Sequence, residues 1–460
     1  MAEPRLIIIG LDSVSPRIAF EVLEDVMPCL KSLRQSGRHG PLRSTDPPVT
    51  IPAWVTMTTG KDPGELGVYG FRNRRVGSYG MDLVSPSIVS HPRLWDLAAS
   101  AGLSSVVVSV PLTYPPRAHP GGVMTSCFLT PGSKSAWVAP TEQQQDLEAR
   151  FGPYLVDVPD FRTDDKERLL AGCRALTAQH FGIFRHLVES TSPHFAMIVD
   201  LAPDRLHHGL LGAILEEHNL FDPSSRFVQE CRAYYRDLDR EIERTLSLAG
   251  PDTVIMVVSD HGVRPLEGAV CVNEWLIKEG YLVLEESPKT PTPLSRLPVD
   301  WSRTRAWGEG GHHCRICFNV IGREPEGIVP ADRLDAERRQ LIRRIESLSG
   351  PDGKRLDNTV IIPEERYLEV KGLPPDLMVY WDDLRFRSVG TVGHGTVFTT
   401  SNDLGHDEAN HARDGIFVIG GADVRAEEEA TGFEIRDVFA TSASVLGLDP
   451  PSGTTGKMLL

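Results

Sequence analysis

The chain lacks the features that mark disulfide-stapled and membrane-spanning proteins. Its 460 residues include only 7 cysteines, an odd number scattered along the chain, which does not suit a disulfide framework. No stretch approaches the roughly 18 apolar residues that a membrane helix needs. The first apolar run, Leu6 to Ile9, is too short for the core of a signal peptide. We therefore expect a cytoplasmic protein with no membrane partner.

Positive charge is also scarce. The chain has 48 Lys and Arg against 63 Asp and Glu, which gives a formal net charge of -15. Proteins that bind nucleic-acid polymers use Lys and Arg to neutralise phosphates, so the acidic balance argues against such a partner. Hydrophobic residues make up 40% and charged residues 24%, as in a folded globular protein and unlike a disordered chain.

Short apolar runs alternate with amphipathic stretches along the chain. Because the apolar runs are continuous, they predict strands buried on both faces, as in a mostly parallel sheet flanked by helices. This alternation indicates an open α/β fold. The predicted strands are Leu6–Leu11, Val106–Val110, Phe195–Val199, Val254–Val258 and Ile416–Ile419, and the predicted helices are Ser15–Ser36, Arg168–Glu189 and Ser225–Ala249.

Two regions interrupt this alternation. Residues 112–163 are rich in Pro, Gly, Ser and aromatic residues and are expected to form loops, some of them near the substrate site. Residues 285–371 begin with a Pro-rich stretch and are expected to form an inserted cap, because long irregular segments in enzymes often serve as lids or binding loops. Residues 1–284 and 372–460 would then make up the catalytic core.

Acidic residues and histidines follow three of the predicted strands. Asp12 comes directly after the first strand, and the pair Asp260-His261 comes after VIMVVS. Asp204 lies just beyond the third strand, and His208 is four residues further on. Ligand sites in α/β sheets form at the carboxyl ends of the strands. Three strand ends thus deliver residues that bind metals.

The spacings within these groups suit metal binding. Asp204 and His208, at i and i+4, share one face of a helix, whereas His207 would point about a quarter turn away. Asp260 and His261 at a strand end can surround one ion from two sides. Mixed carboxylate and imidazole ligands suit zinc first, with manganese or iron as alternatives. Each group alone could also be a helix cap, a solvated helix face or a turn.

A second signal lies in residues 47–71, PPVTIPAWVTMTTGKDPGELGVYGF. Pro52 favours the first turn of a helix that could run to Thr59 and end at Gly60. Thr50 would then lie at the amino end of this helix, where the dipole and free N–H groups favour anions. A hydroxyl there is placed to act as a nucleophile if a metal lowers its pKa. The alternative is that Thr50 only caps the helix.

Taken in order, these motifs resemble the alkaline phosphatase superfamily, and within it the type I phosphodiesterase / nucleotide pyrophosphatase branch. The similar segments are Ile8–Asp12, residues 50–71, Asp204–His208, Val258–Gly262, His411–Phe417 and Ile435–Lys457. One such motif would be weak, whereas six in order are strong. The resemblance implies an alkaline phosphatase-like α/β core.

The resemblance also implies two divalent metal ions, which we expect to be zinc. The ligands implied for one ion are Asp12, Thr50, Asp260 and His261. Those implied for the other are Asp204, His208 and His411. His411 is preferred over His406 because it stands in register with the Asp414-Gly415-Ile416 part of the motif.

The activity implied by the resemblance is that of a phosphohydrolase. The Thr50 alkoxide would attack phosphorus in line, and water would hydrolyse the resulting phosphothreonine. We predict that the bond cleaved is a phosphodiester or pyrophosphate bond of a small molecule. A phosphomonoesterase or a phosphomutase could use the same site. A non-catalytic metal-dependent binding protein is less favoured, because the ligand set and Thr50 are complete.

Residues that contact the substrate are less clearly marked. Nucleotide pyrophosphatases have an asparagine after the nucleophile that helps bind a phosphoryl oxygen, but the matching position here is Phe71. Asn73 could take this role, as could Arg72 or Arg74.

Four further features carry weaker predictions. Tyr114 and Lys134 lie in segments that resemble parts of predicted phosphohydrolases, and they could line a pocket for the leaving group. The Cys-x-x-Cys at Cys314–Cys317 could bind zinc, but the alternation of RICFNVIG favours an ordinary strand. Trp301 and Trp307 could stack on a base, although packing is the simpler role.

Overall fold

The computed structural model describes residues 4–400, 402–422, 424–426 and 429–460. The chain divides into two units. Unit 1 consists of Met1–Leu66, Ser85–Val263 and His411–Leu460, and unit 2 consists of Gly67–Val84 and Arg264–Asn410. The predicted cap, residues 285–371, lies within unit 2, which also takes in the residues on either side of it and the separate segment Gly67–Val84.

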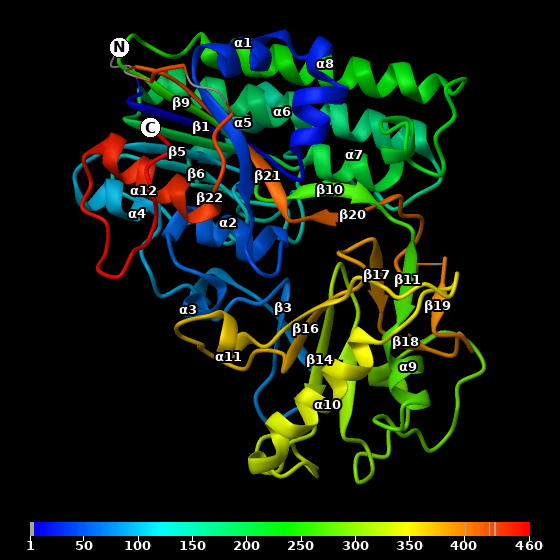
Figure 1. The fold of residues 1–460 in the computed structure, drawn as a ribbon. Coiled ribbons are helices and arrows are strands. Elements are labelled where there is room, and N and C mark those ends of the chain that lie inside the picture. Colours follow the sequence, from blue (N-terminus) through cyan, green and yellow to red (C-terminus); the bar gives the residue numbers. More distant parts are fainter. Residues whose placement is uncertain (1–3, 401, 423, 427–428) are drawn as a thin grey trace. The chain divides into compact units, whose positions relative to one another are not determined.

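Unit 1 is built on a nine-stranded sheet (Figure 1). Its strands, from one edge to the other, are β22 (Phe433–Glu434), β2 (Arg38–Arg43), β21 (Asp414–Gly421), β9 (Val254–Val258), β1 (Leu6–Leu11), β8 (Phe195–Asp200), β5 (Ser105–Val108), β6 (Val123–Thr125) and β7 (Val138–Ala139). Among the described strands of this sheet, β21 and β7 run against the direction that the others share. The predicted mostly parallel sheet is therefore confirmed.

Helices cover both faces of this sheet. One face carries α1 (Pro28–Ser36), α6 (Lys166–Thr191) and α8 (Arg226–Leu246), and the other carries α2 (Thr50–Thr59), α4 (Leu94–Ser100) and α12 (Ile435–Leu446). Alternate residues of β1 face the second layer, where Leu6 and Ile8 share a buried cluster with Trp54 and Phe439. The continuous apolar runs thus form strands with helices on both sides, as the sequence predicts.

Two local predictions differ from the structure. The predicted helix Ser15–Ser36 is broken into a π-helical turn, a short 3₁₀ turn and α1, which begins at Pro28. Proline has no N–H to continue a helix and restricts the residue before it, so the helix has to restart at Pro28. Residues 112–163 are not loops throughout, because they include β6, β7 and α5 (Gln143–Phe151).

Unit 2 is built from smaller sheets. A four-stranded antiparallel sheet contains β13 (Ala306–Glu309), β14 (Cys314–Phe318), β16 (Leu377–Tyr380) and β15 (Thr359–Ile361). A three-stranded sheet contains β17 (Phe386–Val389), β11 (Gly268–Cys271) and β19 (Phe398–Thr399). The remaining main elements are the hairpin β3 (Arg72–Arg74) and β4 (Met81–Leu83), and the helices α9 (Val272–Lys278) and α10 (Leu334–Glu346).

The core of unit 2 accounts for two of the weaker sequence signals. Cys314 and Cys317 belong to the strand β14, which confirms the strand prediction, and both side chains are buried. Trp307 is also buried in this core. Trp301 stacks flat on Tyr79, with ring centroids 3.5 Å apart. Both tryptophans therefore have a packing role.

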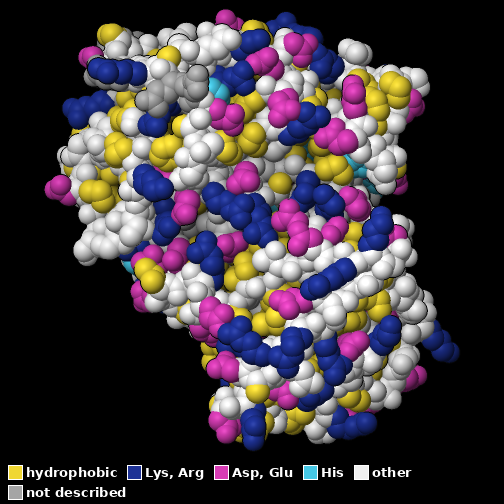
Figure 2. Space-filling model, in the orientation of Figure 1, with side chains coloured by type: hydrophobic (Ala, Val, Ile, Leu, Met, Phe, Trp, Pro, Cys, Tyr) yellow, Lys and Arg dark blue, Asp and Glu magenta, His cyan; other side chains and the backbone are white. Residues whose placement is uncertain are grey.

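The surface mixes charges of both signs. On the face drawn in Figure 2, Lys and Arg side chains are interspersed with Asp and Glu. Exposed ion pairs also occur, such as that of Arg150 with Asp146, 2.8 Å apart. Among the residues that the structure describes, no helix combines the length and the apolar character needed to cross a bilayer.

Candidate metal centre

The topology of unit 1 brings the predicted ligands to one edge of the sheet. Leu11 at the end of β1 is in register with Asp200 at the end of β8, and Gly10 is in register with Val258 at the end of β9. Because β21 is antiparallel to β9, its first residues lie at this same edge. Asp12 comes directly after β1, and Asp260-His261 comes one residue after β9. The helix α7 (Ala202–Leu210) follows β8, and β20 (Ala409–Ala412) precedes β21. The acids and histidines of four separate segments therefore meet there.

Asp12, Asp260 and His261 form the first group. Their ligand atoms all lie within 4.8 Å of one another, and all three residues are fully buried. The Nε2 atom of His261 lies 3.2 Å from Oδ2 of Asp260 and 3.6 Å from Oδ1 of Asp12. These atoms are placed so that a single ion could contact all three.

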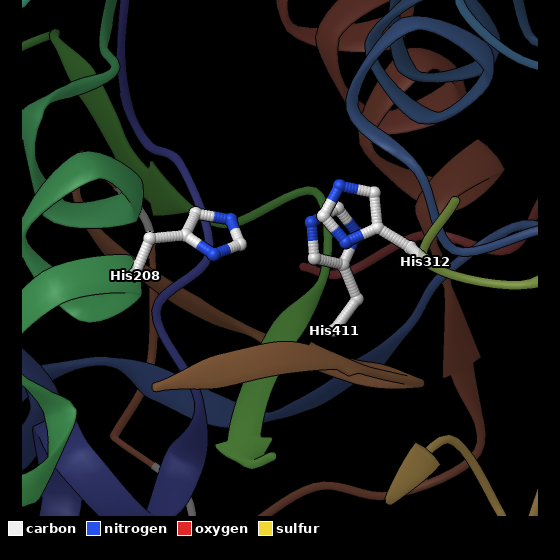
Figure 3. A group of neighbouring side chains, drawn as sticks. All are labelled: His208, His312 and His411. Carbon is white, nitrogen blue, oxygen red and sulfur yellow. The ribbon is translucent and has the colours of Figure 1, made fainter. Parts of the chain in front are cut away.

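Asp204, His208 and His411 gather beside this group. Oδ1 of Asp204 lies 3.5 Å from Nε2 of His208 and 3.9 Å from Nε2 of His411. The rings of His261 and His411 stack with centroids 3.7 Å apart, and Asp204, His261 and His411 also have ligand atoms within 4.8 Å of one another. Figure 3 shows His208 extending from α7 and His411 from β20; the third residue it labels, His312, belongs to unit 2. The two groups are therefore neighbours.

In each of the three carboxylates, one oxygen accepts a hydrogen bond and the other has no hydrogen-bond partner. The bonded oxygens accept from N–H groups: Asp12 from the Trp54 indole at 2.8 Å, Asp260 from the Ser13 backbone at 3.2 Å, and Asp204 from Arg205 at 2.6 Å. The other oxygens, Oδ1 of Asp12, Oδ2 of Asp260 and Oδ1 of Asp204, are buried without a hydrogen-bond partner. Buried polar atoms are rarely left unpaired, and cations would satisfy all three.

The histidines present lone pairs to these bare oxygens. Nδ1 of His261 donates to the Gly262 carbonyl at 3.0 Å, and Nδ1 of His411 donates to the Pro48 carbonyl at 2.8 Å. Burial lowers the pKa of His261 to about 4, and burial together with His261 lowers the pKa of His411 well below its usual value. Both rings are then neutral, and their Nε2 lone pairs face carboxylate oxygens. Backbone carbonyls orient metal-binding histidines in this way.

The carboxylates are crowded as well as buried. Burial raises the pKa of Asp12 well above its ordinary value, and the nearby charge of Asp204 adds to this effect. Burial and the charge of Asp12 do the same for Asp260. Burial alone would also raise the pKa of Asp204, but His208 and Arg205 hold it well below the ordinary value. The cluster carries more negative charge than its one arginine offsets, so its donor set fits divalent cations.

Thr50 lies against the first group. It is the first residue of α2, and its Oγ1 is 3.4 Å from Nε2 of His261. Val49 occupies the cap position, and no side chain caps the helix, so the interpretation of Thr50 as a helix cap is wrong. Gly60 ends the helix in the left-handed conformation, with φ 68°, as the sequence predicts.

Trp54 connects α2 to the first group, and the sequence reasoning missed it. It lies one turn after Thr50 on α2 and reaches Asp12 from there. Gly10 makes room for its ring, because a Cβ at position 10 would lie 2.4 Å from the indole. The glycine of the IIIGLD motif and the tryptophan of TIPAW are thus two halves of one contact, which neither motif reveals alone.

The two alternative histidines have other partners. His207, the alternative to His208, points its Nε2 to the Tyr235 hydroxyl at 2.5 Å. His406, the alternative to His411, belongs to unit 2, where its Nε2 lies 3.0 Å from Glu408. It is His208 and His411 that approach Asp204.

The predicted substrate contacts lie outside these groups. Asn73, in unit 2, accepts from the Tyr69 backbone N–H at 3.2 Å and donates to the Gly67 carbonyl at 2.6 Å, so its amide closes its own turn. Arg74 is buried against Glu324. In unit 1, Tyr114 is half-buried and Lys134 is exposed, and neither is part of the metal groups. A substrate role for these residues stays a prediction.

The comparisons with known proteins agree with the motifs and the fold. The model of the family described as type I phosphodiesterase / nucleotide pyrophosphatase matches residues 6–410. Phosphonoacetate hydrolase from Sinorhizobium meliloti 1021 has a similar structure in its complexes with phosphonoformate and with phosphonoacetate. In each case the TM-score is 0.62, the identity is 16%, and 96% of both chains is covered. No curated protein matches the sequence.

Proposed function

The chain belongs to the type I phosphodiesterase / nucleotide pyrophosphatase family of the alkaline phosphatase superfamily, and from this premise we propose that it cleaves a phosphodiester or pyrophosphate bond of a small molecule. One observation carries the proposal. Three buried carboxylates, Asp12, Asp204 and Asp260, each direct an unpaired oxygen toward a cluster of histidines beside the Thr50 hydroxyl. Such a cluster suits cations and an anionic substrate better than it suits a purely structural role.

Two divalent ions, zinc by the chemistry of the donors, fit the cluster. The residues that would hold one ion are Asp12, Thr50, Asp260 and His261, and those that would hold the other are Asp204, His208 and His411. When bound, such ions lower the pKa of a hydroxyl and offset the negative charge of a phosphoryl group. The unpaired carboxylate oxygens and the Nε2 lone pairs supply donors of the required type.

Thr50 is the proposed nucleophile. Its Oγ1, as an alkoxide, forms a bond to phosphorus while the bond to the leaving oxygen breaks, and water then hydrolyses the phosphothreonine. The hydroxyl stands at the amino end of α2, where the helix dipole favours a phosphoryl group. The site lies at the carboxyl ends of β1, β8 and β9, which is the usual place for catalysis in an open α/β sheet.

The variant Thr50→Ala tests the mechanism. We expect kcat to fall by about 10³-fold or more while both ions stay bound, because the nucleophile is lost and most ligands remain. The matched control is Thr58→Ala, which removes the same atoms from a buried threonine of the same helix and should keep near-normal turnover. Steady-state assays together with metal analysis measure both quantities. Near-normal turnover in Thr50→Ala would refute the covalent mechanism.

A comparison of substrates tests the type of bond. Faster turnover of bis-p-nitrophenyl phosphate than of p-nitrophenyl phosphate is expected for a diesterase. The reverse order would favour a phosphomonoesterase, and transfer of labelled phosphate between positions of one product would favour a phosphomutase. Phosphonoacetate belongs in the same panel because of the structural similarity to phosphonoacetate hydrolase. A protein that binds metal but turns over no substrate of the panel would support a binding role.

A further inference from the structure

Asp204 differs from the other two carboxylates in the charge of its partner. Asp12 and Asp260 each accept from a neutral donor, an indole and a backbone N–H. Asp204 accepts through Oδ2 from Nη1 of Arg205, its neighbour on α7, at 2.6 Å. Charge-assisted hydrogen bonds of this kind are shorter and roughly twice as strong as neutral ones. The orientation of Asp204 therefore depends on where the guanidinium lies.

Arg205 is itself held on three sides. Its Nε and Nη2 donate to the two oxygens of Asp157, at 2.8 and 2.9 Å. The guanidinium carbon lies 4.2 Å from the ring centroid of Phe161 and 5.6 Å from that of Phe128. A planar fork paired with a carboxylate and stacked on aromatic rings has little freedom to turn. The three residues that hold Arg205 all come from residues 112–163, the stretch that the sequence predicts to be loops.

We propose that Asp157 and Arg205 are positioning residues for Asp204. Arg205 occupies Oδ2 and so leaves only Oδ1, the atom 3.5 Å from His208 and 3.9 Å from His411, to bind an ion. Asp157 holds the guanidinium in the position that this requires. The inference rests on the proposed function, because it concerns the second of the two ions.

The positive charge of Arg205 has an effect on metal binding that opposes its effect on the orientation of Asp204. A cation beside an ion site repels the ion, so removing Arg205 would strengthen metal binding if repulsion dominated. Asp157 carries the opposite charge in direct contact with Arg205, and the two together are close to neutral. Orientation is then the main effect of the pair on the ion, and its loss should weaken binding. Partners of metal ligands typically contribute about 10–100-fold to metal affinity.

The test measures zinc binding to the metal-free protein by calorimetry and by competition with a chromophoric chelator. The wild type is expected to bind two ions. In Arg205→Met, Arg205→Lys and Asp157→Asn, one ion should bind with unchanged affinity and the other about 10–100-fold more weakly. Arg205→Lys keeps the charge but cannot form the fork, so it separates orientation from charge. The control Arg185→Lys changes another largely buried arginine, which pairs with Glu241 and is not a partner of Asp204 in the described contacts.

Each outcome decides the proposal. Two ions bound with wild-type affinities in the variants, or tighter binding in Arg205→Met, would overturn it and leave the proposed function intact. A wild type that binds fewer than two ions would overturn it together with the metal part of the proposed function. Asp157→Asn covers the risk that the arginine variants do not fold, because the Asp157 side chain is 26% exposed. A purely structural role would lower the melting temperature of the metal-free variants without changing one affinity selectively.

Discussion

Each unit of this protein buries a cluster of charged side chains, and the two clusters differ in how they are satisfied. In unit 2, Asp376 and Glu324 accept from nearby donors through every carboxylate oxygen. Asp376 accepts from Arg323 and Arg338 through Oδ1, and from Arg323 and the Phe318 backbone through Oδ2. In unit 1, Asp12, Asp204 and Asp260 each keep one bare oxygen.

The difference extends to the electrostatics. Burial alone would raise the pKa of Asp376, but hydrogen bonds and charge from Arg323, with the charge of Arg74, hold it below its ordinary value. The pKa of Asp12 is instead raised, because burial and a neighbouring carboxylate act together. The carboxylates of the unit 2 cluster are fully paired within the protein, whereas those of unit 1 lack positive charge. Completeness indicates a structural role, and its absence indicates a ligand.

Metal removal should have the largest effect, and only through the cluster of unit 1. With a strong chelator we expect hydrolysis to stop and the protein to lose stability, because an ion present at 1,000 times its Kd stabilises the folded state by about 4 kcal/mol. Activity assays and calorimetry, each with and without zinc added back, measure the two effects. Full activity of a protein shown to be metal-free would contradict the interpretation of the unit 1 cluster as a metal site needed for hydrolysis.

Asp376→Asn should destabilise the fold strongly. Removing one partner from a buried ionic network costs about 3–5 kcal/mol in the free energy of unfolding, which urea denaturation measures. Metal content should not change, because the residue belongs to the other cluster. Asp352→Asn is the control, since this exposed carboxylate pairs only at the surface with Lys354 and should show no measurable change. Loss of bound metal in Asp376→Asn would contradict the separation of the two clusters.

Asp12→Asn should raise the free energy of unfolding of the metal-free protein, whereas Asp376→Asn should lower it. The substitution removes a buried charge that lacks a partner on Oδ1, so we expect the metal-free variant to be more stable than the metal-free wild type by about 1–2 kcal/mol. The same variant should bind one ion fewer. Denaturation in the presence of chelator, compared with metal analysis in its absence, shows both effects. Destabilisation of the metal-free variant would mean that the cluster of unit 1 is satisfied without ions.

The smallest predicted effect is the pH dependence of the stability that Asp376 contributes. Because the pKa of Asp376 is lower in the folded protein than in the unfolded chain, its contribution is complete above the unfolded value, about 3.9, and is lost as the pH falls toward the folded value. The difference in stability between the wild type and Asp376→Asn should therefore narrow below about pH 4. Urea midpoints of the metal-free proteins at several pH values measure this difference. A constant difference down to low pH would show that Asp376 is not held ionised by its arginines.

Much of the fold could be predicted from local patterns. The runs Leu6–Leu11 and Val254–Val258 are strands with the predicted bounds, because a continuous apolar run in an α/β chain has few other places to be buried. The helix predicted over Ser15–Ser36 fails because periodicity takes no account of the break that Pro28 imposes.

For the candidate site, the sequence by itself determined that Asp12, Asp204 and Asp260 each come after a buried strand. The carboxyl ends of parallel strands meet at one edge of the sheet, so these residues had to lie near one another. Only the tertiary structure decided which neighbours complete them. Trp54 reaches Asp12 from α2, and Asp157 reaches Arg205 from 48 residues away in the chain. Such contacts depend on the direction in which buried side chains point after packing, and no local spacing encodes that direction.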